Sequence, residues 1–237
     1  MKSAFVVAAT LVAFASGVRA AETYDNYAAF YDAQPGTVFR NPIKYDRNAI
    51  YSYQGEKGTY AEMQTALDGK TINVMLAENR LTINGRTYRF ASAMTFAGEH
   101  PSYIDPFGAD VFLASRTTDH PAILCLEATT EGSGEADRHT QIYLLINPLA
   151  QKGKVKFLHL PSLLSSCRAV VATKDGKLAF PKNSYLFDDA QESRVGLLVS
   201  YYSFENQRFV SVPFPNQLRL RFTNPEIPFQ FSVEDKD

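Results

Sequence analysis

The residues best suited to acid–base chemistry lie close together in one proline-rich segment, residues 98–106, which contains Glu99, His100 and Asp105. A carboxylate beside an imidazole can transfer protons during catalysis, and functional residues are often found on loops held by a rigid scaffold. The same composition is also typical of an ordinary connection between strands that is stiffened by proline. We therefore take these three residues as the catalytic candidates and a plain turn as the alternative.

Four histidines recur at almost even intervals: His100, His120, His139 and His159. In a protein built of strands and turns, such spacing could bring imidazoles to one rim as metal ligands. However, no two histidines are close enough in sequence to form a local ligand pair. His159 also alternates with Val155 and Phe157, which indicates a hydrogen-bonded residue on an apolar face. We predict no metal site.

The two cysteines, Cys125 and Cys167, predict a disulfide if the chain is exported, because exported proteins fold in an oxidising compartment. The alternative is a pair of buried thiols that pack as small apolar side chains. A redox site is not indicated, since no Cys-x-x-Cys spacing occurs.

Aromatic residues supply the first candidates for protein contact. The chain has 13 tyrosines and no tryptophan, and Tyr is enriched at protein interfaces. Tyr201 and Tyr202 are adjacent in a predicted strand, so one of them must point away from the core. Phe204 follows at a predicted hairpin tip, residues 204–207. The alternative explanation for all three is cross-strand packing, which also favours aromatic residues.

Acidic residues supply the second candidates for protein contact, in the polar stretch 129–138. Glu131, Glu135 and Asp137 could face a basic partner, although a hairpin loop exposed to solvent is the simpler interpretation. Elsewhere, three lysines near residue 154 form only a small basic patch, and the formal net charge is −1. Nucleic acid is therefore not an expected partner.

No signature of a hydrolase nucleophile, a dinucleotide site, a phosphate-binding loop or a metal site occurs in a credible context. We expect no cofactor. Catalytic triads and carboxylate pairs are defined by geometry rather than by sequence order. The absence of a sequence signature therefore does not exclude an enzyme.

Residues 1–20 read as an export signal. Met1 and Lys2 precede an apolar run over residues 4–18, and Val18-Arg19-Ala20 fits cleavage after Ala20. The run is shorter than the about 20 apolar residues that a spanning helix needs, and no second run follows. No cysteine lies at the cleavage site, so we expect neither a lipid anchor nor a membrane span. The predicted location is the periplasm or the exterior.

The rest of the chain, residues 21–237, predicts a single β-rich domain. We expect a helix over residues 23–32 capped by Thr23, and a second short helix from Thr59 to Asp68 because Thr59 and Glu62 fit a capping box. Beyond these, apolar runs and period-two patterns predict about a dozen strands, with a tight hairpin at residues 84–85 and a second hairpin at residues 175–176. The predicted fold class is all-β, an antiparallel sandwich or barrel with one or two short N-terminal helices. A small β-propeller is the alternative.

Three functional hypotheses follow. The first is an exported binding protein, for example an inhibitor or immunity-type protein that blocks a toxin or hydrolase through a protein–protein interface. The second is an exported hydrolase whose site is assembled from distant loops. The third is a structural component of the envelope. The sequence leaves the partner and the oligomeric state open.

Overall fold

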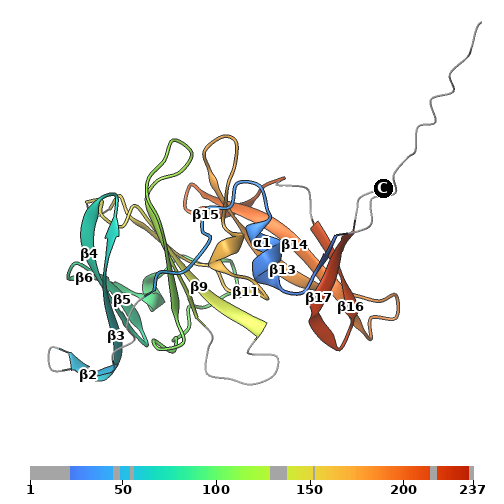
Figure 1. The fold of residues 1–237 in the computed structure, drawn as a ribbon, viewed down its shortest axis with the longest axis horizontal. Helices are drawn as coiled ribbons and strands as arrows, with labels where there is room; N and C mark the ends of the chain where they lie inside the picture. The colour runs from blue at the N-terminus through green and yellow to red at the C-terminus, as the bar shows by residue number, and fades with distance from the viewer. Residues whose placement is uncertain are drawn as a thin grey trace, which may run out of the picture.

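The computed structural model describes residues 22–44, 49–53, 56–128, 138–151, 153–213 and 218–234. The predicted export signal and the acidic candidates Glu131, Glu135 and Asp137 lie outside these residues. The described chain is mostly β, with antiparallel pairing between the strands of each sheet, so the predicted all-β class is confirmed (Figure 1).

Three sheets make up the fold. The N-terminal sheet has the order β2-β3-β4-β5-β6, the central sheet has the order β10-β9-β8-β7 with β11 beside β9, and the C-terminal sheet has the order β1-β17-β16-β14-β13-β12 with β15 beside β14. Sheets of such unequal size and order are not the equivalent four-stranded blades of a propeller. The sandwich prediction therefore describes this architecture better than the propeller alternative does.

The bounds of the elements are as follows. The N-terminal sheet contains β2 (Ala49–Tyr53), β3 (Glu56–Leu67), β4 (Lys70–Ala77), β5 (Arg80–Ile83) and β6 (Arg86–Arg89). The central sheet contains β7 (Asp110–Ala114), β8 (Ile123–Ala128), β9 (His139–Ile146), β10 (Lys156–His159) and β11 (Ser162–Leu163). The C-terminal sheet contains β1 (Thr23–Tyr24), β12 (Val171–Ala172), β13 (Leu178–Phe187), β14 (Arg194–Glu205), β15 (Arg208–Ser211), β16 (Leu218–Asn224) and β17 (Ile227–Glu234). The helical segments are α1 (Tyr27–Asp32) and the 3-10 turns η1 (Phe90–Ser92) and η3 (Cys167–Ala169).

The central sheet is buried on both faces. On β8, Leu124 and Leu126 pack into a core shared with the N-terminal sheet, whereas Ile123 and Cys125 pack into a core shared with the C-terminal sheet. Successive side chains of a strand point to opposite faces, so a strand between two cores must be apolar throughout. This explains why the central strands read as continuous apolar runs.

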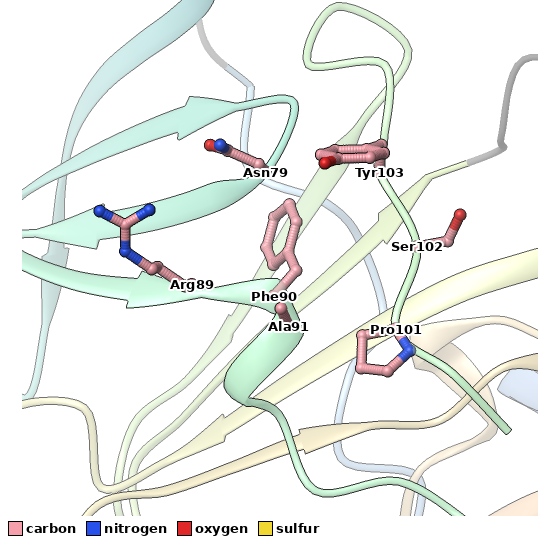
Figure 2. Close-up of a pocket in the computed structure, with 7 residues that line it drawn as sticks. All are labelled: Asn79, Arg89, Phe90, Ala91, Pro101, Ser102 and Tyr103. Carbon is pink, nitrogen blue, oxygen red and sulfur yellow. The ribbon is translucent and has the colours of Figure 1, made fainter.

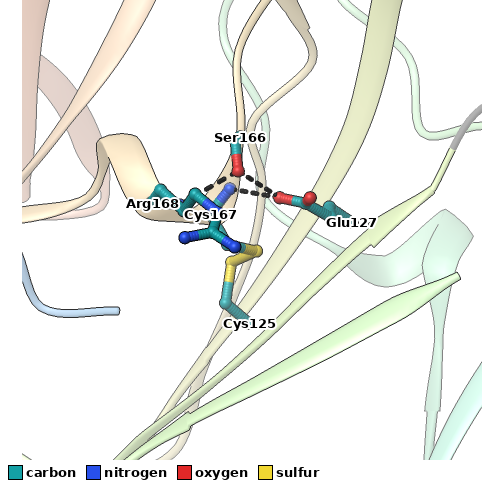
Figure 3. The surroundings of a disulfide bond; sticks show 5 residues. All are labelled: Cys125, Glu127, Ser166, Cys167 and Arg168. Atoms are coloured by element: carbon teal, nitrogen blue, oxygen red, sulfur yellow. Dashed lines mark hydrogen bonds between the residues drawn. A yellow bond between two sulfur atoms is a disulfide. The ribbon is translucent and has the colours of Figure 1, made fainter. Parts of the chain in front are cut away.

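The predicted disulfide is confirmed: Cys125 on β8 is bonded to Cys167 in η3, with Cα atoms 5.9 Å apart. Beside it, one carboxylate oxygen of Glu127 accepts hydrogen bonds from the Ser166 hydroxyl (2.6 Å) and from the Cys167 backbone N–H (2.5 Å), as Figure 3 shows. Burial raises the pKa of Glu127, although these two hydrogen bonds favour its charged form. The disulfide thus joins the central sheet to the segment that leads into β12.

The two hairpin predictions are confirmed, the tight one at residues 84–85 and the second at residues 175–176. Asn84 and Gly85 join β5 to β6 with φ values of 48° and 78°, the left-handed conformation that a two-residue hairpin turn needs. Asp175 and Gly176 lie in the connection from β12 to β13. The predicted tip after Phe204 is also a hairpin turn, between β14 and β15.

The second predicted helix is wrong. Residues 59–67 belong to β3, which pairs with β4 from Tyr60↔Ala77 to Leu67↔Lys70. The capping-box pattern is a local signal, and it loses to the burial of Ala61, Met63 and Leu67 on the core face of the sheet. Asp68-Gly69, taken as the end of that helix, is instead the turn into β4.

The first helix is shorter than predicted. It begins at Tyr27, because the side chain of Asn26 accepts a hydrogen bond from the backbone N–H of Ala29 (2.8 Å) and caps it. Thr23, the predicted cap, pairs instead with Ser232 as part of β1. The prediction missed this because the partner strand lies at the other end of the chain.

Candidate functional site around Tyr103

The three catalytic candidates do not form an acid–base cluster with one another in the described chain. The carboxylate of Glu99 lies 3.2 Å from the ammonium of Lys182. Asp105 accepts backbone hydrogen bonds from Phe107 (2.9 Å) and Gly108 (3.1 Å), so it stabilises a turn. His100 is exposed.

The aromatic candidates pack against neighbouring side chains. Tyr201 is only 2% exposed and belongs to the core beneath α1, so its ring is closed to a partner in this fold. Tyr202 points to the opposite face, as expected of its neighbour, and there it packs edge-on against Phe96. Phe204 packs against Phe209.

The most exposed large apolar side chain of the described residues is a different aromatic. Tyr103 is 70% exposed, whereas Phe187, Ile227 and Phe229 on the C-terminal sheet are 43%, 51% and 49% exposed. Tyr103 lies within the same proline-rich segment that carries the catalytic candidates. An exposed tyrosine offers a partner a large ring together with a polar hydroxyl group.

The segment that carries Tyr103 is tied down on both sides of the ring. The Tyr143 hydroxyl donates to the Ser102 carbonyl (2.6 Å) and accepts from the Ser102 N–H (3.0 Å). The Ile104 N–H donates to the Glu78 carbonyl (3.0 Å), and the Ile104 side chain is buried. The exposed ring is therefore presented by a fixed backbone.

Tyr143 is itself held in a buried stack. Its ring lies 4.1 Å from that of Phe90 and 4.7 Å from that of His159, measured between centroids. Burial raises the pKa of its hydroxyl, which keeps the hydroxyl neutral and able to donate. The clamp on Ser102 thus reaches into the core of the central sheet.

His159 is a hydrogen-bonded core residue, as predicted. It is fully buried, with Nε2 2.7 Å from the Gln141 Oε1 and Nδ1 3.2 Å from the Thr95 hydroxyl. Burial lowers the pKa of His159 to about 4, so the ring is neutral at pH 7.

Next to Tyr103 the surface is hollowed into a pocket of about 240 Å³. The lining residues are Asn79, Arg89, Phe90, Ala91, Pro101, Ser102 and Tyr103. Figure 2 shows the Phe90 ring between the hairpin that carries Asn79 and the loop segment that carries Tyr103, while the Arg89 guanidinium extends away from this ring. The pocket is therefore lined by three separate segments of the chain, which contain residues 79, 89–91 and 101–103.

Arg89, which lines this pocket, has a second arginine as its neighbour in the sheet. Arg80 on β5 and Arg89 on β6 are direct cross-strand partners, in a row that continues through Ala77 to Tyr60. Arg80 donates to the Asn79 side chain (3.2 Å) and to the Tyr60 hydroxyl (3.2 Å).

Among the described residues, no group of three or more His, Cys, Asp or Glu side chains is arranged to hold a metal ion. In the same part of the chain, no helix has the length and hydropathy to cross a membrane. No family model, curated protein or solved structure matches the chain. The site must therefore be interpreted from its own geometry.

Proposed function

We propose that this protein is an exported binding protein that contacts a protein partner through the surface around Tyr103. The observation that carries the proposal is the exposure of Tyr103 on a backbone held by Tyr143 and Glu78. Tyrosine and arginine are the residues most enriched among the energetic centres of protein interfaces, and Arg89 lines the same pocket.

Rigidity supports the same interpretation. A backbone that is already fixed loses little conformational entropy when a partner covers it, so more of the contact energy remains as affinity. The bonds from Ser102 and Ile104 provide this fixation on either side of the ring. A loop that served only as a connection would gain nothing from holding an aromatic ring in water.

The disulfide is compatible with an exported protein, which agrees with the proposed location. An inhibitor or immunity-type role against an exported toxin or hydrolase is one form that this binding function would take. The hydrolase alternative has less support, since Glu99 is paired with Lys182 and Asp105 accepts the hydrogen bonds of a turn.

A capture experiment tests the proposal. The purified protein and its Tyr103→Ala and Phe187→Ala variants are each immobilised and exposed to an extract of the cell envelope. Phe187 is the matched control, because it is an exposed aromatic on a different sheet. We expect one protein that is retained by the wild type and by Phe187→Ala and lost from Tyr103→Ala. Equal retention by all three forms would contradict the proposal.

A further inference from the structure

We propose that a cleft between the central and C-terminal sheets binds a small organic anion with an apolar body, such as a fatty acid or an aromatic carboxylate. The cleft has a volume of about 440 Å³, against about 240 Å³ for the pocket beside Tyr103, and the two share no lining residue. Pockets that bind small molecules commonly measure about 300–1,000 Å³. The lining of the cleft includes Ile146, Lys156, Leu178, Phe180 and Phe204.

Both sheets contribute strand ends to this cleft. From the central sheet come Ile146 at the end of β9 and its cross-strand partner Lys156 at the start of β10. From the C-terminal sheet come residues 176–178 of the β12–β13 hairpin and Phe204 near the end of β14. Side chains of both sheets pack into one apolar core directly beneath, so the walls of the cleft are held in place.

The inner surface of the cleft is apolar. Ile146 and Leu178 are each 8% exposed and Phe180 is 1% exposed, so these side chains form its floor. The Phe204 ring is half-buried and packs edge-on against that of Phe209, with 5.1 Å between the centroids. Such a surface offers apolar contact to a ligand, and a few polar groups at the rim then select among ligands.

One ammonium group at the rim has no carboxylate partner. Lys156 is exposed, and its Nζ lies 5.7 Å from the centre of the Phe204 ring. Within the described part of the chain it is in no ion pair. By contrast, Lys177 at the same cleft is paired with Glu205 (3.0 Å) and with Asp175 (3.3 Å). Lys156 is therefore the positive group that a ligand can neutralise.

Glu205 does not reverse this preference for an anion. Its hydrogen bonds from Lys177 and from the Ser203 hydroxyl (2.8 Å) lower the pKa of Glu205, so its charge is present and already compensated. Lys154, which is exposed in the turn before β10, adds positive charge nearby. The electrostatics of the rim thus favour an anion over a cation.

A monoanion with an apolar body fits both parts of the cleft. Its carboxylate accepts a charge-assisted hydrogen bond from Lys156, while its body covers the apolar floor. Lysine is a compact charge on a flexible stem, so it binds an anion without demanding the planar geometry that an arginine selects. Phe204 and the basic patch near residue 154 are separate features of the sequence, and the fold brings them together at this cleft.

Defined probes test the ligand class. The protein, with labelled isoleucine and leucine methyl groups, is titrated with 2-naphthoate, with decanoate, and with 2-naphthamide as the neutral probe of matching shape. We expect saturable NMR shifts at Ile146 and Leu178 with at least one of the two anions. The Kd of 2-naphthamide should be about tenfold or more above that of 2-naphthoate. Binding of neither anion, or equal binding of 2-naphthamide and 2-naphthoate, would overturn the inference.

Substitutions separate direct contact from general attraction by the basic patch. Lys156→Gln should raise the Kd of the bound anion about tenfold, the loss expected for one charge-assisted hydrogen bond. Lys154→Gln is the matched control and should change it by no more than about twofold, because exposed charges without direct contact are screened. Both side chains are exposed, so both variants should melt at the wild-type temperature. Equal effects of the two substitutions on the Kd would contradict a specific site at Lys156.

The inference is independent of the proposed function, because it concerns a different surface. Tyr103→Ala should therefore bind the anion as the wild type does. Loss of anion binding in Tyr103→Ala would contradict a separate site in the cleft, whereas loss of the protein partner alone would leave the inference intact.

Discussion

Tyr143 connects the core to the surface through a single hydroxyl group. Its ring is stacked between Phe90 and His159, while its oxygen holds both backbone polar groups of Ser102. Tyr143→Phe keeps the stack and removes only the clamp. We expect a loss of about 1–2 kcal/mol in the free energy of unfolding and faster amide exchange at Ser102. Unchanged exchange at Ser102 would show that the clamp does not hold the segment.

His159 makes the stability of the fold depend on pH. Its pKa is lowered to about 4 by burial, from the ordinary value of 6.5. Below pH 6.5, His159 therefore binds a proton in the unfolded chain, whereas in the folded protein it stays neutral until about pH 4. The free energy of unfolding therefore decreases as the pH falls from 6.5 to about 4. The contribution is about 3 kcal/mol when complete.

The pH effect is measured as a difference between two proteins. Chemical denaturation of the wild type and of His159→Gln is followed between pH 7 and pH 4. The wild type should lose more stability than the variant over this interval. Burial raises the pKa of Glu127, a shift whose stabilising contribution is lost as the pH rises; it is common to both proteins and cancels. Parallel curves would contradict the assigned shift.

At the scale of elements, close approach between two strands depends on a glycine. A Cβ atom added at Gly196 on β14 would lie 2.0 Å from the Leu220 carbonyl oxygen on β16. Gly196→Ala should therefore force the two strands apart and cost about 2–3 kcal/mol in unfolding free energy. Ser200→Ala on the same strand is the control, and urea denaturation is the measurement. An equal effect of both substitutions would argue against the crowding.

Much of this element-level structure could be predicted from the sequence. The turns at Asn84-Gly85 and Asp175-Gly176 could be predicted, because their residue types suit the backbone angles of hairpin turns. The helix predicted from Thr59 failed because strand pairing depends on a partner, and a local capping pattern carries no information about that partner. A glycine after an aspartate at residues 68–69 was the available signal for the hairpin that exists there.

The candidate site was less predictable. The catalytic candidates and the proposed contact residue Tyr103 lie in the same segment, residues 98–106, but the sequence analysis considered the titratable groups there and not the aromatic one. The exposure of Tyr103 depends on bonds from Tyr143, which is 41 positions from Ser102, and from Glu78. The pairing of Arg80 with Arg89 depends on the register of one hairpin. Neither contact can be predicted from residues that are neighbours in the sequence. A tyrosine between Pro101 and Pro106 was the only hint.

At the scale of the whole molecule, the disulfide and an ion pair join separate layers. Cys125 belongs to the central sheet, and Cys167 lies next to Arg168, whose guanidinium is 2.7 Å from the Asp32 carboxylate of α1. The bond closes a loop with a sequence separation of 42, which the chain-entropy relation converts to about 4 kcal/mol.

Removing the disulfide should therefore weaken the whole fold rather than the site. Cys125→Ala, Cys167→Ala and the double variant should each lower the melting temperature by the same amount, because any one of them opens the loop. Wild-type protein treated with a reductant under denaturing conditions and refolded should match them. A melting temperature that does not respond to these changes would contradict a stabilising role for the bond.

Photo-crosslinking tests whether the Tyr103 surface binds a protein: a photo-crosslinking amino acid is placed at position 103, and cells that export the protein are irradiated. A second form carries the same amino acid at position 187, the exposed aromatic position on the C-terminal sheet. We expect one discrete crosslinked protein from position 103 and none from position 187. No adduct from position 103, or the same adducts from both positions, would contradict it.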